Sequence, residues 1–157
     1  MISIQTEDFS LADEYAAIRS RAGDAGAIVT FTGLVREMYQ ASGQADAGDC
    51  VQSLFLEHYP GMTEKCLQDI QQQAQDRWPL LATRIIHRVG ELRGQDQIVL
   101  VATASAHRHA AFESAEFIMD YLKSKAPFWK KQKTNSESGW IESRDSDQAA
   151  MDRWQKS

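Results

Sequence analysis

The chain has few cysteines and no long hydrophobic segment. Its 157 residues include only Cys50 and Cys66, and neither lies in a CxxC or other metal-binding spacing. We therefore expect both thiols to be structural, in a reducing compartment. No apolar run approaches the ~18 residues of a membrane span, and the acidic N-terminal segment lacks the apolar core of a signal peptide. These absences predict a cytoplasmic protein without a membrane partner.

Motifs for nucleotide, metal and nucleophile chemistry are also missing. The sequence contains no GxGxxG, Walker A, GxSxG or HExxH pattern. His107 and His109 are two residues apart, and such positions on a helix diverge, so we expect no metal site there. A net charge of −5 disfavours general nucleic-acid binding. An enzyme of this kind would use cationic side chains, with neither a metal nor a cofactor.

Positive charge is concentrated in one segment of this acidic chain. Between Ser105 and Lys133 no acidic residue follows Asp120, and five lysines are present: Lys123, Lys125, Lys130, Lys131 and Lys133. Apart from these five, the chain has 12 basic and 22 acidic residues. Such a local excess indicates a binding site for an anion.

Hydrophobic periodicity predicts one α+β domain spanning residues 1–157, with a largely antiparallel sheet and flanking helices. Strands are expected at 2–5, 27–35, 51–59, 82–92 and 97–105, with a final hairpin at 128–134 and 139–144. Helices are expected at 11–20 and 63–78, followed by a long helix that Pro127 ends. The segment 37–49 is predicted to be a mobile loop, and the tail 145–157 a short helix or a docked arm.

Two predicted helices have an apolar stripe, which should face the core. The stripe of the first is Met62, Cys66, Ile70 and Ala74, and that of the second is Ala111, Phe112, Ala115, Ile118, Met119 and Leu122. We interpret His58, His87 and the four tryptophans as structural, as core or interface residues.

Two lysines of the cationic segment are candidates for proton transfer. If the chain reverses at Pro127, the amines of Lys123 and Lys130 would share a pocket, and each charge would lower the pKa of the other. One of them would then act as a general acid or base near neutral pH. The alternative is that the lysines favour the helix dipole and keep a strand edge soluble.

His107 and Arg108 lie at the predicted start of the same long helix. Free backbone N–H groups and the helix dipole favour an anion at this position, and imidazole and guanidinium groups would complete a phosphate or carboxylate site. The alternative is an exposed first turn with solvated side chains. Arg36, at the exit of the 27–35 strand, is a further candidate because strand exits commonly carry functional residues.

Taken together, several segments resemble the large, catalytic subunit of molybdopterin synthase: VTFTGLVR, LEHYPGMTEK, RWPL, IIHRVGEL, SAHRHAAFESAEFIMDYLKSKAPFWKK and ESRDSDQ. The resemblance extends from about residue 5 to residue 154. It implies an α/β hammerhead fold and the conversion of cyclic pyranopterin monophosphate to molybdopterin. It also implies that a small ubiquitin-like subunit donates sulfur from its C-terminal thiocarboxylate, and that two large subunits form the centre of a heterotetramer.

The resemblance also implies roles for individual residues. Lys123 matches the acid/base group nearest the thiocarboxylate, and Lys130 matches a lysine that holds the substrate and assists proton transfer. The other matched substrate contacts are Leu34, Val35, Arg36, His107, Arg108, Lys131, Gln132 and Arg144. Of these, His107 and Arg108 match the pair at the pterin phosphate, and Arg144 an arginine from the neighbouring large subunit.

Two other functions are compatible with parts of the sequence. A non-catalytic scaffold would grip the tail of a ubiquitin-like protein in its basic groove, but it would need no second cationic site for a phosphate. A phosphate-ester hydrolase would need metal ligands or a nucleophile, and neither is evident. A sulfur-transferring enzyme that forms a homodimer is therefore the main hypothesis.

Overall fold

The computed structural model describes residues 1–36, 51–134, 138–141 and 145–155, with the backbone alone at 51–52, 132–134, 138–141 and 145–147. The loop predicted at 37–49 lies outside the described residues. Within the described part of the chain, no helix is long and apolar enough to cross a membrane.

The described strands form two four-stranded sheets rather than the single sheet expected. The first sheet has the order β1 (Ile2–Gln5), β4 (Leu80–Arg88), β6 (Gln97–Ser105) and β2 (Ala27–Leu34). The second has the order β5 (Gly90–Leu92), β3 (Val51–His58), β7 (Phe128–Thr134) and β8 (Ser138–Ile141). All pairings given are antiparallel except that of β1 with β4. The predicted α+β class with largely antiparallel pairing is therefore confirmed.

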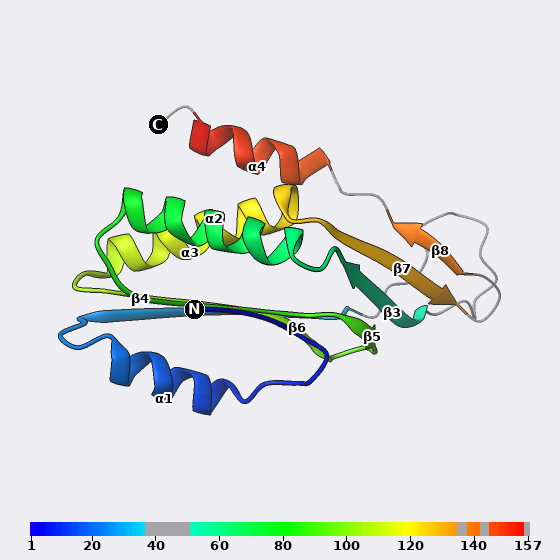
Figure 1. Ribbon diagram of the computed structural model, residues 1–157, viewed down its shortest axis with the longest axis horizontal. Coiled ribbons are helices and arrows are strands. Elements are labelled where there is room, and N and C mark those ends of the chain that lie inside the picture. The colour runs from blue at the N-terminus through cyan, green and yellow to red at the C-terminus, as the bar shows by residue number, and fades with distance from the viewer. Residues whose placement is uncertain (37–50, 135–137, 142–144, 156–157) are drawn as a thin grey trace.

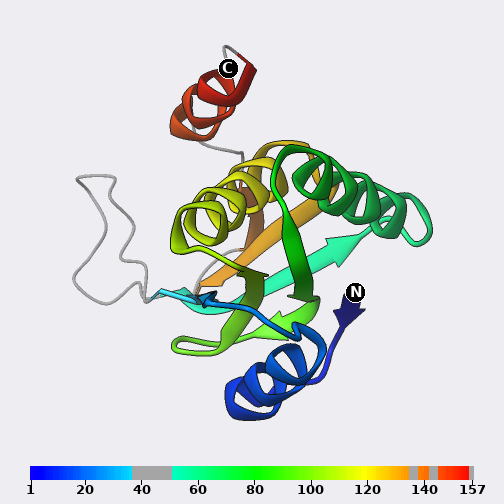
Figure 2. The same ribbon diagram turned by 90° about the vertical axis from the view of Figure 1, so that its left-hand side faces the viewer.

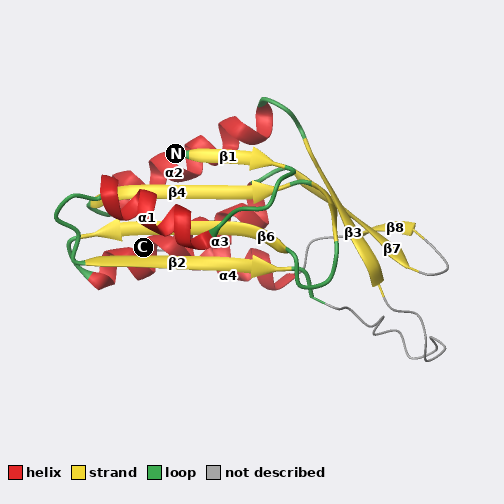
Figure 3. Ribbon diagram, turned by 90° about the horizontal axis from the view of Figure 1, so that it is seen from below, coloured by secondary structure: helices red, strands yellow, loops and turns green. Residues whose placement is uncertain are grey.

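Helices cover both faces of the first sheet (Figure 1). One face carries α1 (Leu11–Arg21), and the other carries α2 (Met62–Arg77) and α3 (Arg108–Lys125), with α4 (Asp145–Gln155) outside them. The view along the long axis of the molecule shows the same layers (Figure 2). The second sheet extends beyond the end of the first, away from α1 (Figure 3). The main core lies between the first sheet and the layer formed by α2 and α3.

Local sequence signals account for several element boundaries. The Ser10 hydroxyl caps α1 by accepting from the backbone N–H of Asp13, at 3.3 Å. The helix α2 ends at Arg77, two residues before Pro79.

The segment 82–92, predicted as one strand, is divided between the two sheets. Gly90 has a φ of 89°, which favours glycine, and it allows the chain to leave β4 and begin β5.

The buried faces of α2 and α3 differ from the predicted stripes at four positions. Met62 and Phe112 are each 61% exposed, and Cys66 and Met119 are only half-buried. In α2 the buried side chains are instead Thr63, Leu67, Ile70 and Ala74, whose helical spacing gives one continuous face. The predicted stripes include exposed residues because hydrophobic periodicity alone does not fix how a helix is rotated about its axis against the sheet.

The C-terminal segment is a helix that docks against α3. Trp154 is buried edge-on against Trp78 and Phe117, with ring centroids 5.7 and 5.6 Å away. Its indole N–H donates to the Asp120 carboxylate at 2.6 Å, and Arg153 pairs with Glu116 at 2.8 Å. Of the two alternatives for this tail, the described residues 145–155 form the short helix, and this helix is docked against α3.

Candidate functional site

The candidate lysines lie where α3 gives way to β7. Lys123 is exposed in the last turn of α3, and Lys130 is exposed in β7. Between them, the carbonyl oxygen of Pro127 accepts a hydrogen bond from the Thr63 hydroxyl at 3.2 Å, which anchors the junction to α2. The predicted reversal of the chain at Pro127 is wrong, because β7 leads away from the end of α3 instead of returning along it (Figure 1).

Pairing with β3 determines which way the lysines of β7 face. Lys130 is opposite Leu56, which is buried, whereas Lys131 is opposite Phe55, which is 40% exposed. Since successive residues of a strand point to opposite faces, Lys130 leaves β7 on its core-facing side and Lys131 on the outer side. Gln132 is opposite Leu54 in the register, and its side chain lies outside the described residues.

The segment Leu34–Arg36 lies on the same side of the molecule as Lys130. Val35 is buried in a cluster with Leu54, Leu56 and Leu92 of the second sheet, and Lys130 pairs with Leu56. The backbone N–H of Val35 donates to the Asp96 carbonyl at 2.8 Å, and the Val35 carbonyl accepts from Gln95 at 2.9 Å. These contacts fix the chain next to Arg36, whose side chain is exposed.

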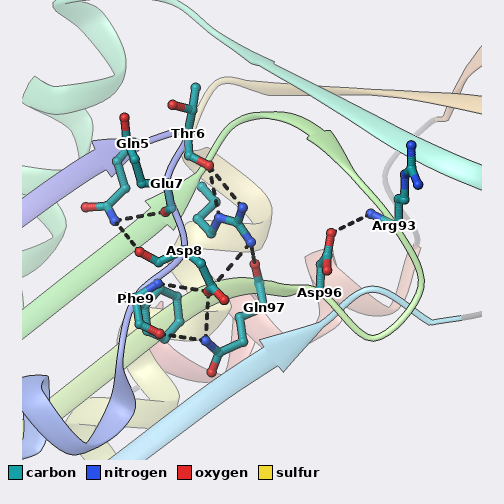
Figure 4. A network of polar contacts seen from close by, with 9 residues as sticks. Gln5, Thr6, Glu7, Asp8, Phe9, Arg93, Asp96 and Gln97 are labelled. Atoms are coloured by element: carbon teal, nitrogen blue, oxygen red, sulfur yellow. Dashed lines mark hydrogen bonds and ion pairs between the residues drawn. The ribbon is translucent and has the colours of Figure 1, made fainter.

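A polar network holds this end of the first sheet (Figure 4). The guanidinium of Arg88 donates to the carbonyl oxygens of Thr6, at 3.0 and 3.2 Å, and Gln97, at 2.9 Å. The Gln97 amide donates to the carboxylate of Asp8 at 2.8 Å, and this hydrogen bond is the main reason why the pKa of Asp8 is lowered. The exit of β2 is thereby fixed, since Leu34 pairs with Gln97.

A second candidate site is an open cavity of about 650 Å³ at the start of α3. We call it the α3 pocket, and its lining residues are Gly26, Ala106, His107, Arg108, His109, Phe112 and Glu113. His107 is the N-cap residue, yet no side chain caps the helix, and the first turn has no acidic residue. The free N–H groups and the helix dipole therefore favour an anion beside His107 and Arg108.

The carboxylate of Glu113 lines this pocket but is already bound by neighbouring groups. It accepts from the indole N–H of Trp78 at 2.9 Å and pairs with the His109 imidazole at 3.3 Å. These contacts offset part of its repulsion for an incoming anion. Sequence analysis did not identify Gly26, Phe112 or Glu113 as site residues. Phe112 was assigned to an apolar stripe and therefore expected to be buried, whereas its ring is exposed.

Gly26 closes the wall of the α3 pocket by direct backbone contact. Its N–H donates to the Ser105 carbonyl at 3.1 Å, and a Cβ atom here would collide with the carbonyl oxygen of Ala106. We expect Gly26→Ala to destabilise the fold by roughly 1–3 kcal/mol and to displace the His107 end of the pocket. The measurement is the thermal unfolding midpoint. The exposed neighbour Asp24 is the control, since Asp24→Ala should leave the midpoint almost unchanged, and an unchanged midpoint in Gly26→Ala would contradict the close contact.

Comparison with known proteins identifies the family. A sequence profile described as MoaE protein matches residues 4–125. The chain is 56% identical over 154 residues to the molybdopterin synthase catalytic subunit of Vibrio cholerae, covering 98% of this chain and 97% of that protein. The chain belongs to the MoaE protein family. The predicted family and the predicted class of enzyme are thus confirmed.

Solved structures of MoaE proteins share the whole fold. A molybdopterin biosynthesis MoaE protein from Burkholderia ambifaria superposes with a TM-score of 0.82 at 48% identity, covering 99% of this chain and 97% of that one. A molybdopterin synthase structure from Staphylococcus aureus gives a TM-score of 0.77 at 31% identity, covering 88% and 95%.

In this MoaE chain the candidate residues fall into two groups that one copy cannot bring together. Arg108 and Lys123 are at opposite ends of α3, and 15 residues at 1.5 Å each separate them by about 22 Å. The pairing of β2 with β6 also separates the two groups. Leu34, two residues before Arg36, pairs with Gln97 at one end of β6, whereas Ala27, next to Gly26 of the α3 pocket, pairs with Ser105 at the other end. We call the group at the α3–β7 junction the lysine site, which comprises Arg36, Lys123 and Lys130. The α3 pocket is the other group.

Proposed function

We propose that this chain converts cyclic pyranopterin monophosphate to molybdopterin with sulfur from the C-terminal thiocarboxylate of a small ubiquitin-like subunit. The observation that carries the proposal is the lysine site itself. Its three cations are exposed, with Lys123 in the last turn of α3, Lys130 in β7 and Arg36 just after β2, in a chain whose net charge is −5. Both the donor tail and the cyclic phosphate are anions, so this junction suits them.

Each sulfur transfer replaces an oxygen on a substrate carbon with sulfur. The thiocarboxylate sulfur bonds to the substrate carbon as the carbon–oxygen bond there breaks, and that oxygen leaves as water or, where the ring opens, stays on the phosphate ester. Water then attacks the donor's acyl carbon, the bond between this carbon and sulfur breaks, and the donor tail leaves as a carboxylate. We assign Lys123 to proton transfer nearest the thiocarboxylate, and Lys130 to holding the substrate and assisting that transfer. Arg36, with the backbone of Leu34 and Val35, would contact the substrate at the same junction.

We further propose that a complete site needs two copies of the chain. The α3 pocket suits the phosphate end of the substrate, with His107 and Arg108 as its cations, but it is about 22 Å from Lys123 along the same helix. A two-fold homodimer can place the α3 pocket of one copy against the lysine site of the other. Arg144 lies outside the described residues, and its proposed role is to reach the neighbouring copy's site. Gln132, two residues after Lys130 in β7, would line the same site, whereas Lys131 leaves the strand on its outer side.

This dimer would be the centre of a heterotetramer with a small subunit at each end. A cytoplasmic location fits the two cysteines, whose spacing suits neither a disulfide framework nor a metal site. No part of the proposed chemistry requires a resident metal or cofactor, since lysine and arginine supply both the proton transfer and the anion stabilisation.

The test is reconstitution from purified components. The chain is mixed with cyclic pyranopterin monophosphate and a thiocarboxylated small subunit, and the dithiolene pterin is detected as its fluorescent oxidised derivative. We expect product only when all three components are present, and none when the small subunit ends in an ordinary carboxylate. Binding of the small subunit without any product would instead support the non-catalytic scaffold.

A further inference from the structure

His87 lies where the two sheets meet. In the first sheet it pairs with Ile4 of β1 and Val99 of β6. Its imidazole stacks on the ring of Phe128 at the start of β7, with ring centroids 3.7 Å apart and an interplanar angle of 13°. This stack is therefore a direct contact between the strand β4 of one sheet and the strand β7 of the other.

The orientation of the His87 ring is fixed by its own strand. Its Nδ1 atom is 2.8 Å from the carbonyl oxygen of Arg88, which can only accept a hydrogen bond. The proton of the neutral ring is therefore on Nδ1, and Nε2 carries a lone pair. The pKa of His87 is lowered to about 4, chiefly by burial and also by the nearby Lys130 and His58, while the hydrogen bond to Arg88 acts in the opposite direction. The ring is consequently neutral at pH 7.

Lys130 follows Phe128 by two residues in β7, so both side chains leave the strand on the same face. The register agrees, since Phe128 is opposite His58 and Lys130 is opposite Leu56 on β3. Other charged or titratable side chains near the His87 ring, those of His58, Glu64 and Arg88, have partners of their own. His58 is paired with Glu64 of α2 at 3.6 Å, and the guanidinium of Arg88 is directed to backbone oxygens of Thr6 and Gln97.

We propose that His87 is a positioning residue for Lys130. Its locked ring, stacked on Phe128, determines where β7 crosses the first sheet and hence where the Lys130 amine meets the substrate. An uncharged ring is required there, because a second positive charge would repel the Lys130 ammonium. The inference rests on the proposed function in one respect, which is the contact of Lys130 with the substrate.

Three substitutions separate stacking from simple filling of space. His87→Phe keeps a flat ring that can stack on Phe128, His87→Leu keeps a similar volume without a ring, and His87→Ala removes both. In the reconstituted reaction we expect kcat to fall about 10–100-fold in the Leu and Ala variants, with the KM for the small subunit unchanged. His87→Phe should remain within about threefold of the wild type. Assays are run well below each variant's unfolding midpoint.

A pH profile provides a second measure that simple packing would not change. As the pH falls from 6 towards 4, wild-type kcat should fall relative to that of His87→Phe, because only the histidine gains a charge beside Lys130. A constant ratio of the two would overturn the requirement for a neutral ring. Equal kcat values for the Leu and Phe variants would overturn the role of the stack.

Lys130→Ala, assayed in parallel, separates this inference from the proposed function. If Lys130→Ala is inactive and all His87 variants keep wild-type kcat, the role of His87 is wrong and the role of Lys130 stands. If Lys130→Ala keeps full activity, the assignment of Lys130 fails, and the positioning role fails with it.

Discussion

Replacing Lys123 by alanine should abolish product formation and leave the fold intact. Loss of a positioned acid/base group lowers a rate by typically 10²–10⁴-fold, so little or no product should form in this variant. The side chain is exposed in the last turn of α3, so its removal should change the free energy of unfolding by no more than about 0.5 kcal/mol. The measurements are the rate of dithiolene pterin formation and the thermal unfolding midpoint.

Lys125 provides a matched control for this variant. It is exposed in the same turn of α3, and its ammonium lies over the ring of Tyr121, 4.9 Å from the centroid, instead of taking part in the proposed chemistry. Lys125→Ala removes the same charge and should keep most of the activity. Turnover near the wild-type level in Lys123→Ala would contradict its assignment as the acid/base group. Equal losses in both variants would mean that the net charge of this segment matters and no single acid/base group does.

Mixing two inactive variants should restore activity if the site is shared between copies. Arg108→Ala damages the α3 pocket and Lys123→Ala damages the lysine site, so each homodimer is inactive. In a mixed dimer both defects fall in one of the two sites, and the other site is intact. With random exchange, half of the dimers are mixed and each has one working site, so we expect about a quarter of wild-type activity.

The matched control for this experiment mixes Lys123→Ala with Lys130→Ala. Both changes affect the lysine site, so every site in the mixed dimer keeps one defect and no activity should return. Two purification tags, one on each variant, isolate the mixed dimers and show that exchange has occurred. Mixed dimers of Arg108→Ala and Lys123→Ala that stay inactive would exclude a site shared in this way.

Features that depend on neighbouring residues in the chain were predictable. The Ser10 cap, the end of α2 before Pro79 and the strongly apolar strand β6 follow from local chemistry, because capping, proline geometry and strand propensity act over a few residues. The hairpin of β7 and β8 was predicted from the turn-forming segment between the two strands, and their antiparallel pairing confirms it.

Features that depend on packing were predicted less well. Periodicity placed Met62 and Phe112 in buried stripes, but both are largely exposed. The packing of a helix on its sheet decides which face of the helix is buried. The single strand predicted at 82–92 is two strands, since the positive φ of Gly90 redirects the chain into the second sheet.

The sequence by itself determined which chemistry this protein can carry out. The cationic segment, the His107–Arg108 pair and the missing metal and nucleotide motifs together indicate proton transfer to anionic substrates. Only the tertiary structure decided which of these residues can act together. The rigid length of α3 separates Arg108 from Lys123, whereas the stacking of His87 on Phe128 places His87 beside the strand that carries Lys130. Such groupings depend on contacts between segments distant in the chain, and no local pattern encodes them.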